Sequence, residues 1–119
     1  GLQMLFDRSY EFGEHEGLGL LPGEGTKLHP EGRPLPHIAW TSIDVRGGRL
    51  LSGVKSGEYF YFVHSYCVHA ADVRDEAAVA EYGETFTAVA ERDNVFGVQF
   101  HPEKSGARGL DILKNFIGI

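Results

Sequence analysis

The segment Tyr59–Val68 constrains the fold more than any other part of the sequence, because apolar or aromatic side chains occupy both of its alternating faces. Successive side chains of a strand point to opposite faces of the sheet. A strand that is apolar on both faces is expected to be covered on both sides, as the strands of layered α/β proteins are. This segment therefore predicts a strand buried from both sides.

The other expected elements are shorter. Four further β-segments are predicted, at Thr26–His29, Ile38–Ile43, Phe86–Ala90 and Val95–Phe100. The last two flank Glu91–Asn94, and this spacing predicts a hairpin. Gly109–Ile117 places apolar side chains on one face of a helix, with Ser105 upstream as a candidate cap. Because no repeat or composition change divides the chain, residues 1–119 are interpreted as a single domain.

The composition excludes several classes of partner. The 11 basic and 17 acidic residues give a net charge of −6 without a basic block, so nucleic acid is not an expected partner. No apolar stretch reaches the length that spans a membrane, and no basic and apolar leader opens the chain, so no membrane association is expected. The single cysteine cannot form an internal disulfide, which indicates a reducing cytoplasm.

His101-Pro102-Glu103 follows the apolar run Val95–Phe100 directly. Residues two apart in an extended chain point to the same side, and Pro102 restricts the backbone of His101. A carboxylate beside an imidazole can fix its tautomer and stabilise its protonated form, as in the base of a nucleophilic triad. The pair therefore predicts two members of a catalytic triad without its nucleophile. The alternative interpretation is a strand end that carries a solvated ion pair.

Cys67 is the sole cysteine, and His64 and His69 lie near it in the sequence. His64 and Cys67 are three residues apart, so their side chains face opposite sides of a strand, and no sharp turn presents the thiol. Cys67 is therefore interpreted as a half-buried structural thiol and not as a nucleophile. The six histidines and the cysteine lack the paired spacing of common metal sites, so no metal ion is expected.

The string Phe-Gly-Val-Gln-Phe-His-Pro-Glu-Lys-Ser at 96–105 resembles the His/Glu segment of the triad-type, class I glutamine amidotransferases. Gly1-Leu2-Gln3 resembles the end of their nucleophile elbow, G-x-C-x-G-x-Q. Further strings resemble the glutaminase subunits of imidazole glycerol phosphate synthases, at Gly17–Gly23, Pro36–Trp40, Tyr61–Tyr66 and Leu113–Phe116. The resemblance covers residues 1–119 but only the later part of the family's domain.

This resemblance implies both a fold and an activity. The expected fold is the C-terminal part of a doubly wound α/β domain, a mostly parallel sheet flanked by helices with a β-hairpin before the His/Glu segment. The expected activity is hydrolysis of L-glutamine to glutamate and ammonia. The ammonia would pass to a cyclase subunit with a (β/α)₈ barrel in histidine biosynthesis. Neither a metal nor an organic cofactor is implied.

The resemblance also assigns residues to roles. His101 corresponds to the general base and acid of the triad, and Glu103 to the residue that orients it. Gln3, Ser65 and Tyr66 correspond to the segments that hold the amino-acid head group of glutamine. The elbow cysteine and the oxyanion donors lie outside residues 1–119, so this chain alone is expected to be inactive.

Lys104, Trp40 and Tyr61 correspond to the face that docks on the cyclase. Ala39 and Thr41 depart from the Gly and Asn that relatives commonly have in this region. Two other interpretations stay open. One is the glutaminase of another pathway, such as anthranilate synthase, and the other is a non-catalytic scaffold module derived from an amidotransferase.

Overall fold

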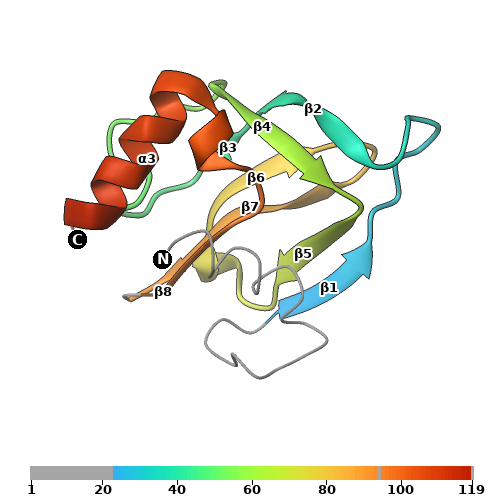
Figure 1. Ribbon diagram of the computed structural model, residues 1–119. Coiled ribbons are helices and arrows are strands. Elements are labelled where there is room, and N and C mark those ends of the chain that lie inside the picture. Colours follow the sequence, from blue (N-terminus) through green and yellow to red (C-terminus); the bar gives the residue numbers. More distant parts are fainter. Residues whose placement is uncertain (1–22, 94, 119) are drawn as a thin grey trace.

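The computed structural model describes residues 23–118 except Asn94. These residues form eight strands, two short 3-10 helices and one α-helix. In chain order the elements are β1 (Gly23–Lys27), β2 (His37–Ser42), β3 (Asp44–Val45), β4 (Tyr59–His64), β5 (Tyr66–Ala70), η1 (Val73–Asp75), β6 (Glu76–Glu81), β7 (Thr85–Arg92), β8 (Val95–Val98), η2 (Pro102–Lys104) and α3 (Gly106–Gly118). Figure 1 shows α3 on one side of the molecule and β1 on the other.

The described strands pair only in antiparallel fashion: β1 with β5, β2 with β4, and β3, β6, β7 and β8 in that order. The expected mixed α/β fold is confirmed, and so is the hairpin before the His/Glu segment, formed by β7 and β8. The prediction of a mostly parallel sheet is wrong for these residues. Parallel neighbours need a crossover of a dozen or more residues, usually a helix, and the described residues before Gly106 contain no α-helix.

The observed strands differ from the sequence prediction at Tyr59–Val68 and at β3 and β6, neither of which was predicted. The predicted strand Tyr59–Val68 is interrupted at Ser65, so that β4 pairs with β2 while β5 pairs with β1. Strand β6 was not predicted, because three of its six residues are alanines, which have a low preference for strands. Pairing with both β3 and β7 makes β6 an internal strand despite that composition.

Aromatic side chains form the centre of the core. Phe60 and Phe62 occupy alternate positions of β4 and are fully buried. Their ring centroids lie 4.4 and 5.6 Å from that of Phe100, the residue before His101. Complete burial of one such side chain contributes about 1.5–3 kcal/mol. The residue that precedes the candidate catalytic pair is therefore anchored in the core.

Helix α3 packs closely on the η2 turn. A Cβ added to Gly109 would lie 2.0 Å from the carbonyl oxygen of Pro102 and 2.9 Å from the Cβ of Ser105. The buried side chain of Ile112 joins the helix to the core. This contact positions the turn that contains Glu103.

We expect Gly109→Ala to lower the free energy of unfolding by about 1–3 kcal/mol, because the added methyl group must push the helix away from η2. The change is expected even though alanine is favoured over glycine inside a helix by about 1 kcal/mol. Urea denaturation measures the difference. Gly118→Ala is the matched control, since no atom lies within 4 Å of a Cβ added there. Equal stability of the two variants would contradict the close contact.

Candidate functional site

The structure brings the side chains of His101 and Glu103 together. His101 Nδ1 lies 3.2 Å from Glu103 Oε2, and the two side chains are 20% and 46% exposed. A carboxylate only accepts hydrogen bonds, so Nδ1 carries the proton when the imidazole is neutral. Nε2 is then the basic nitrogen, the arrangement that a general base needs.

The backbone of β4 holds the pair in place through Tyr61. The amide of Tyr61 donates to Ser105 Oγ at 2.9 Å, and its carbonyl accepts from the amide of His101 at 2.9 Å. Ser105 Oγ donates in turn to the carbonyl of His101 at 2.6 Å. Ser105 precedes α3, as the sequence suggested, but its side chain fixes His101 and not the helix. Sequence reasoning missed this role, because the bond to Tyr61 spans 44 positions.

A chain of buried hydrogen bonds lies beside the pair. His37 Nδ1 is 2.9 Å from His64 Nε2, His64 Nδ1 is 2.8 Å from the carbonyl of Tyr66, and His37 Nε2 is 2.7 Å from Thr41 Oγ. A carbonyl only accepts, so His64 donates from Nδ1 and accepts at Nε2. His37 therefore donates from Nδ1, and Thr41 donates to its Nε2. Two neutral histidines satisfy every bond in this chain.

Burial keeps His37 neutral. The side chain has no exposed surface, and its ring stacks on Tyr82 at 3.9 Å and faces Phe62 at 5.3 Å between centroids. Desolvation, followed by the charges of His64 and Arg33, lowers the pKa of His37 from 6.5 to about 4.

His64 is also neutral in this environment. It is 3% exposed, and burial lowers its pKa, against the hydrogen bond to the Tyr66 carbonyl, which raises it. The charge of His101 lowers it further, which indicates that this buried pair and the candidate catalytic pair are electrostatic neighbours. In the sequence, His37 directly precedes the predicted strand Ile38–Ile43, whereas His64 lies inside the predicted strand Tyr59–Val68. The register that makes His37 and His64 direct partners was not visible in it.

Two of the predicted glutamine-binding residues, Ser65 and Tyr66, lie at the break between β4 and β5. The carbonyl of Ser65 accepts from the amide of Leu28 at 2.8 Å, and Tyr66 is exposed. Gln3 lies outside the described residues. Cys67, the next residue in β5, is fully buried and not half-buried as expected. That it is not the nucleophile stays a prediction.

The residues predicted to face a partner form one surface. Trp40 and Tyr61 are direct partners across β2 and β4, with ring centroids 5.8 Å apart, and Trp40 is 51% exposed. The tip of the Trp40 ring lies 4.0 Å from the Cβ position of Gly106, two residues after the exposed Lys104. We call this surface the outer ribbon face; its members on β2 and β4 are Ile38, Trp40, Tyr59, Tyr61 and Val63.

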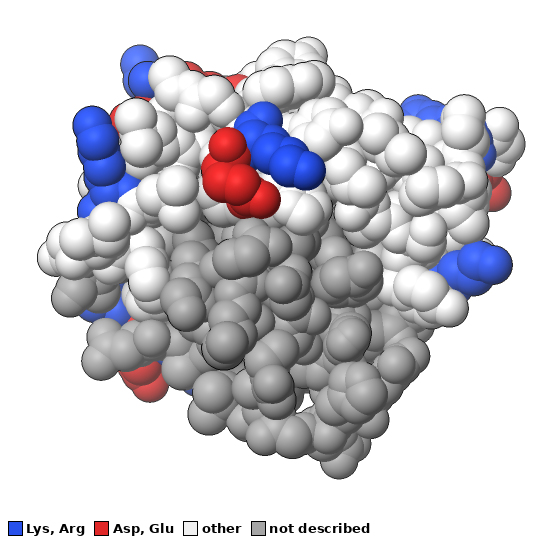
Figure 2. All heavy atoms as spheres, in the orientation of Figure 1, with Lys and Arg blue, Asp and Glu red and all other residues white. Residues whose placement is uncertain are grey.

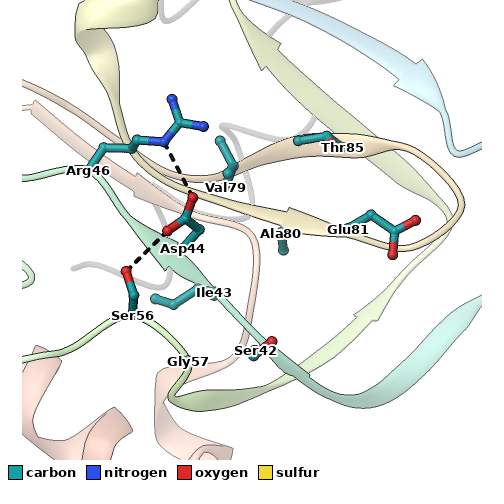
Figure 3. Close-up of a pocket in the computed structure, with 10 residues that line it drawn as sticks. All are labelled: Ser42, Ile43, Asp44, Arg46, Ser56, Gly57, Val79, Ala80, Glu81 and Thr85. Atoms are coloured by element: carbon teal, nitrogen blue, oxygen red, sulfur yellow. Dashed lines mark hydrogen bonds and ion pairs between the residues drawn. The ribbon is translucent and has the colours of Figure 1, made fainter.

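A separate pocket of about 440 Å³ contains none of these candidate residues (Figure 3). One of its two carboxylates, Asp44, accepts from Ser56 Oγ at 3.1 Å and pairs with Arg46 at 3.7 Å. On the face of the molecule in Figure 2, the described Lys and Arg side chains are scattered and do not form one patch. Among the described helices, none has the length and apolar character needed to cross a membrane.

Comparison with known proteins decides the family. The sequence profile of the class-I glutamine amidotransferases matches residues 1–119. The chain belongs to this family. A subunit of imidazole glycerol phosphate synthase, HisH, from Caldanaerobacter subterraneus subsp. tengcongensis is 49% identical over 117 residues, which cover 98% of this chain and 57% of the relative. HisH of Salinibacter ruber is 47% identical over 126 residues, which cover 100% of this amidotransferase chain and 58% of the relative.

The fold has a solved counterpart in Thermoplasma acidophilum. The crystal structure of a protein assigned to GMP synthase superimposes with a TM-score of 0.58 at 21% identity. The match covers 81% of this chain and 47% of the other. At this identity the likeness establishes the fold alone. This amidotransferase chain spans somewhat more than half the length of the two HisH relatives.

We expect the stability of the protein to fall as the pH is lowered, because of His37. Its pKa is lower in the folded state, so the unfolded chain takes up a proton first as the pH drops below about 6.5. The stabilisation that follows from the low pKa of His37 is complete above that pH. Between there and pH 4 the free energy of unfolding falls by at most about 1.4 kcal/mol per pH unit. Urea denaturation at pH 7 and pH 5 measures the loss.

His37→Gln removes the titrating group and keeps a hydrogen-bonding side chain. The difference in unfolding free energy between pH 7 and pH 5 should be smaller in this variant than in the wild type. An identical pH dependence in both proteins would show that His37 is not held neutral by burial.

Proposed function

We propose that this chain is part of the glutaminase subunit of an imidazole glycerol phosphate synthase. It would act in the cytoplasm and form the later part of a single amidotransferase domain. The HisH relatives support the choice within the family, at 47–49% identity. The observation that carries the proposal is the 3.2 Å contact between His101 Nδ1 and Glu103 Oε2 at a partly exposed position.

The proposed chemistry is acyl transfer from the side-chain amide of glutamine. His101 takes the proton of a cysteine thiol, the thiolate attacks the amide carbon, and the tetrahedral intermediate collapses to a thioester as His101 gives that proton to the departing ammonia. His101 then takes a proton from water, which attacks the thioester and releases glutamate and the thiol. Glu103 holds the imidazole in the required tautomer and stabilises its protonated form.

The nucleophile of this proposal is a cysteine outside residues 1–119. Cys67 does not suit the role, because it is fully buried within β5 and lies neither in a sharp turn nor at a helix N-terminus. Gln3, Ser65 and Tyr66 would bind the head group of glutamine. The hydrogen bond from His64 to the carbonyl of Tyr66 supports this, because it fixes the backbone of this segment, and His64 is an electrostatic neighbour of His101.

The outer ribbon face is proposed as the docking surface for a cyclase subunit that receives the ammonia. Trp40 and Tyr61 would supply apolar contact area, and Lys104 a charged contact at the edge. The exposure of Trp40 and its neighbours supports this role, since contiguous apolar surface on a small domain commonly marks an interaction site.

In the complete enzyme with its cyclase, we expect His101→Ala to reduce glutamine-dependent product formation at least about a thousandfold. The loss follows because neither ammonia nor the thiol can leave efficiently without a proton donor and acceptor at that position. Product formation from added ammonium salts is expected to persist, since it bypasses the glutaminase step.

The two substrates provide the control within one protein preparation. Equal loss of glutamine-dependent and ammonia-dependent activity would contradict the role of His101. Residues 1–119 alone are proposed to be inactive toward glutamine, and restoring the complete subunit would restore the activity.

We expect Trp40→Ala to weaken binding of the cyclase at least about tenfold, because truncating a central aromatic residue of an interface commonly costs this much. Calorimetric titration of the cyclase into the complete subunit measures the change. Val73→Ala is the matched control, since Val73 is an exposed apolar residue on η1, outside the outer ribbon face. Unchanged binding of the Trp40 variant would contradict the assignment of this face.

A further inference from the structure

A cluster of metal-ligating side chains lies outside the candidate catalytic site. One ligand atom from each of Cys67, His69 and Glu84 lies within 4.8 Å of the other two. Glu84 also joins a second histidine: its Oε1 lies 3.1 Å from His69 Nε2, and its Oε2 lies 3.1 Å from His29 Nδ1. Three groups that bind transition metals therefore lie around the carboxylate of Glu84.

Three separate segments of the chain position this cluster. Cys67 and His69 are two residues apart in β5, so their side chains share one face of the strand. The amide of Ala70 donates to Thr87 Oγ at 3.0 Å, which holds the end of β5 against β7. In Figure 1 this part of the molecule lies away from α3.

The turn between β6 and β7 brings Glu84 to His29. Gly83 has a φ of +80°, and a Cβ there would lie 2.5 Å from the carbonyl oxygen of His29 and 2.4 Å from the carbonyl carbon of Pro30. Only glycine permits this approach. The amide of His29 then donates to Glu84 Oε2 at 2.6 Å, which orients the carboxylate.

We infer that Cys67, His69, Glu84 and His29 form a binding site for one zinc ion. Thiolate, imidazole and carboxylate are the ligands that zinc takes in proteins, and this mixture does not suit magnesium or calcium. Bond lengths of 2.0–2.3 Å in a tetrahedron place ligand atoms roughly 3.3–3.8 Å apart. His69 Nε2 and His29 Nδ1 each lie 3.1 Å from an oxygen of Glu84, on Oε1 and Oε2 respectively, and the ligand atoms of Cys67, His69 and Glu84, which lie within 4.8 Å of one another, need to approach by about 1 Å.

The charges of the site also match zinc. One thiolate and one carboxylate neutralise the two positive charges of the ion, and both histidines bind as neutral rings. Binding replaces the protons of the thiol and of the ligating ring nitrogens, so affinity falls as the pH is lowered. The ion would link the β1–β2 connection, β5 and the β6–β7 turn. This inference does not depend on the proposed glutaminase activity.

Titration of the complete metal-free protein with cobalt chloride tests the inference. We expect one equivalent of Co²⁺ to bind with a sulfur-to-metal charge-transfer band and the strong visible bands of tetrahedral cobalt, and zinc chloride to displace it. Saturating zinc should raise the Tm by at least about 5 °C. Absence of stoichiometric binding to the folded protein would overturn the inference.

Two variants identify the ligands. Cys67→Ser should abolish the charge-transfer band and weaken binding at least about a hundredfold, and Glu84→Gln should weaken binding while the band persists at higher metal concentration. Glu84→Gln also serves if Cys67→Ser does not fold, since Glu84 lies on a turn. His101→Gln is the matched control and should bind like the wild type. A band that survives in Cys67→Ser, or is lost in His101→Gln, would place the ion elsewhere.

Discussion

The backbone of Tyr61 is the constraint on which the candidate site depends. Its amide and carbonyl are both used by the segment that follows β8, through Ser105 and His101. Both groups lie on β4, whose alternate side chains are anchored in the aromatic core. Hydrogen bonds to the amide and the carbonyl of His101 fix its main chain, and the carboxylate of Glu103 contacts the ring. Rigid placement of this kind is what a proton-transferring residue requires.

The alternating side chains of the paired strands β2 and β4 form two faces, and the two faces have different requirements. Its inner face carries His37 and His64 beside the phenylalanines, so the polar atoms of both rings must be satisfied inside the ribbon itself. Its outer face carries Trp40 and the other exposed apolar residues. Because one strand register fixes both faces, a shift that spoiled the outer surface would also break the histidine pair. The buried histidine pair therefore specifies the register of β2 and β4.

Local patterns in the sequence predicted the hairpin β7–β8, helix α3 and the contact between His101 and Glu103. These features depend on residues close in the chain. The Ser105 contact with Tyr61, the pairing of His37 with His64 and the strand β6 depend on partners far along the chain, and no local period encodes which strand lies next to which. The antiparallel pairing of the described strands was missed for another reason. A mostly parallel sheet was expected from a resemblance to a whole domain, whereas the described part of the chain pairs its strands only in antiparallel fashion.

The same dependence on distant partners explains why the metal-ligating cluster is not apparent in the sequence. Common metal-site spacings pair ligands within one element, but Glu84 reaches β5 from the β6–β7 turn, and His29 reaches Glu84 from the connection between β1 and β2. The cluster and the proposed glutamine-binding segment share β5, since Tyr66 immediately precedes Cys67. Tyr66 is already held from one side by His64 and lies beside Ser65, whose carbonyl is bonded to the β1–β2 connection. An ion bound to Cys67 and His29 would join the same two segments a second time. The ion would then also restrict the motion of Ser65 and Tyr66, the residues proposed to bind glutamine, because they are joined to Cys67 by continuous backbone. No direct contact between the metal and the substrate is needed.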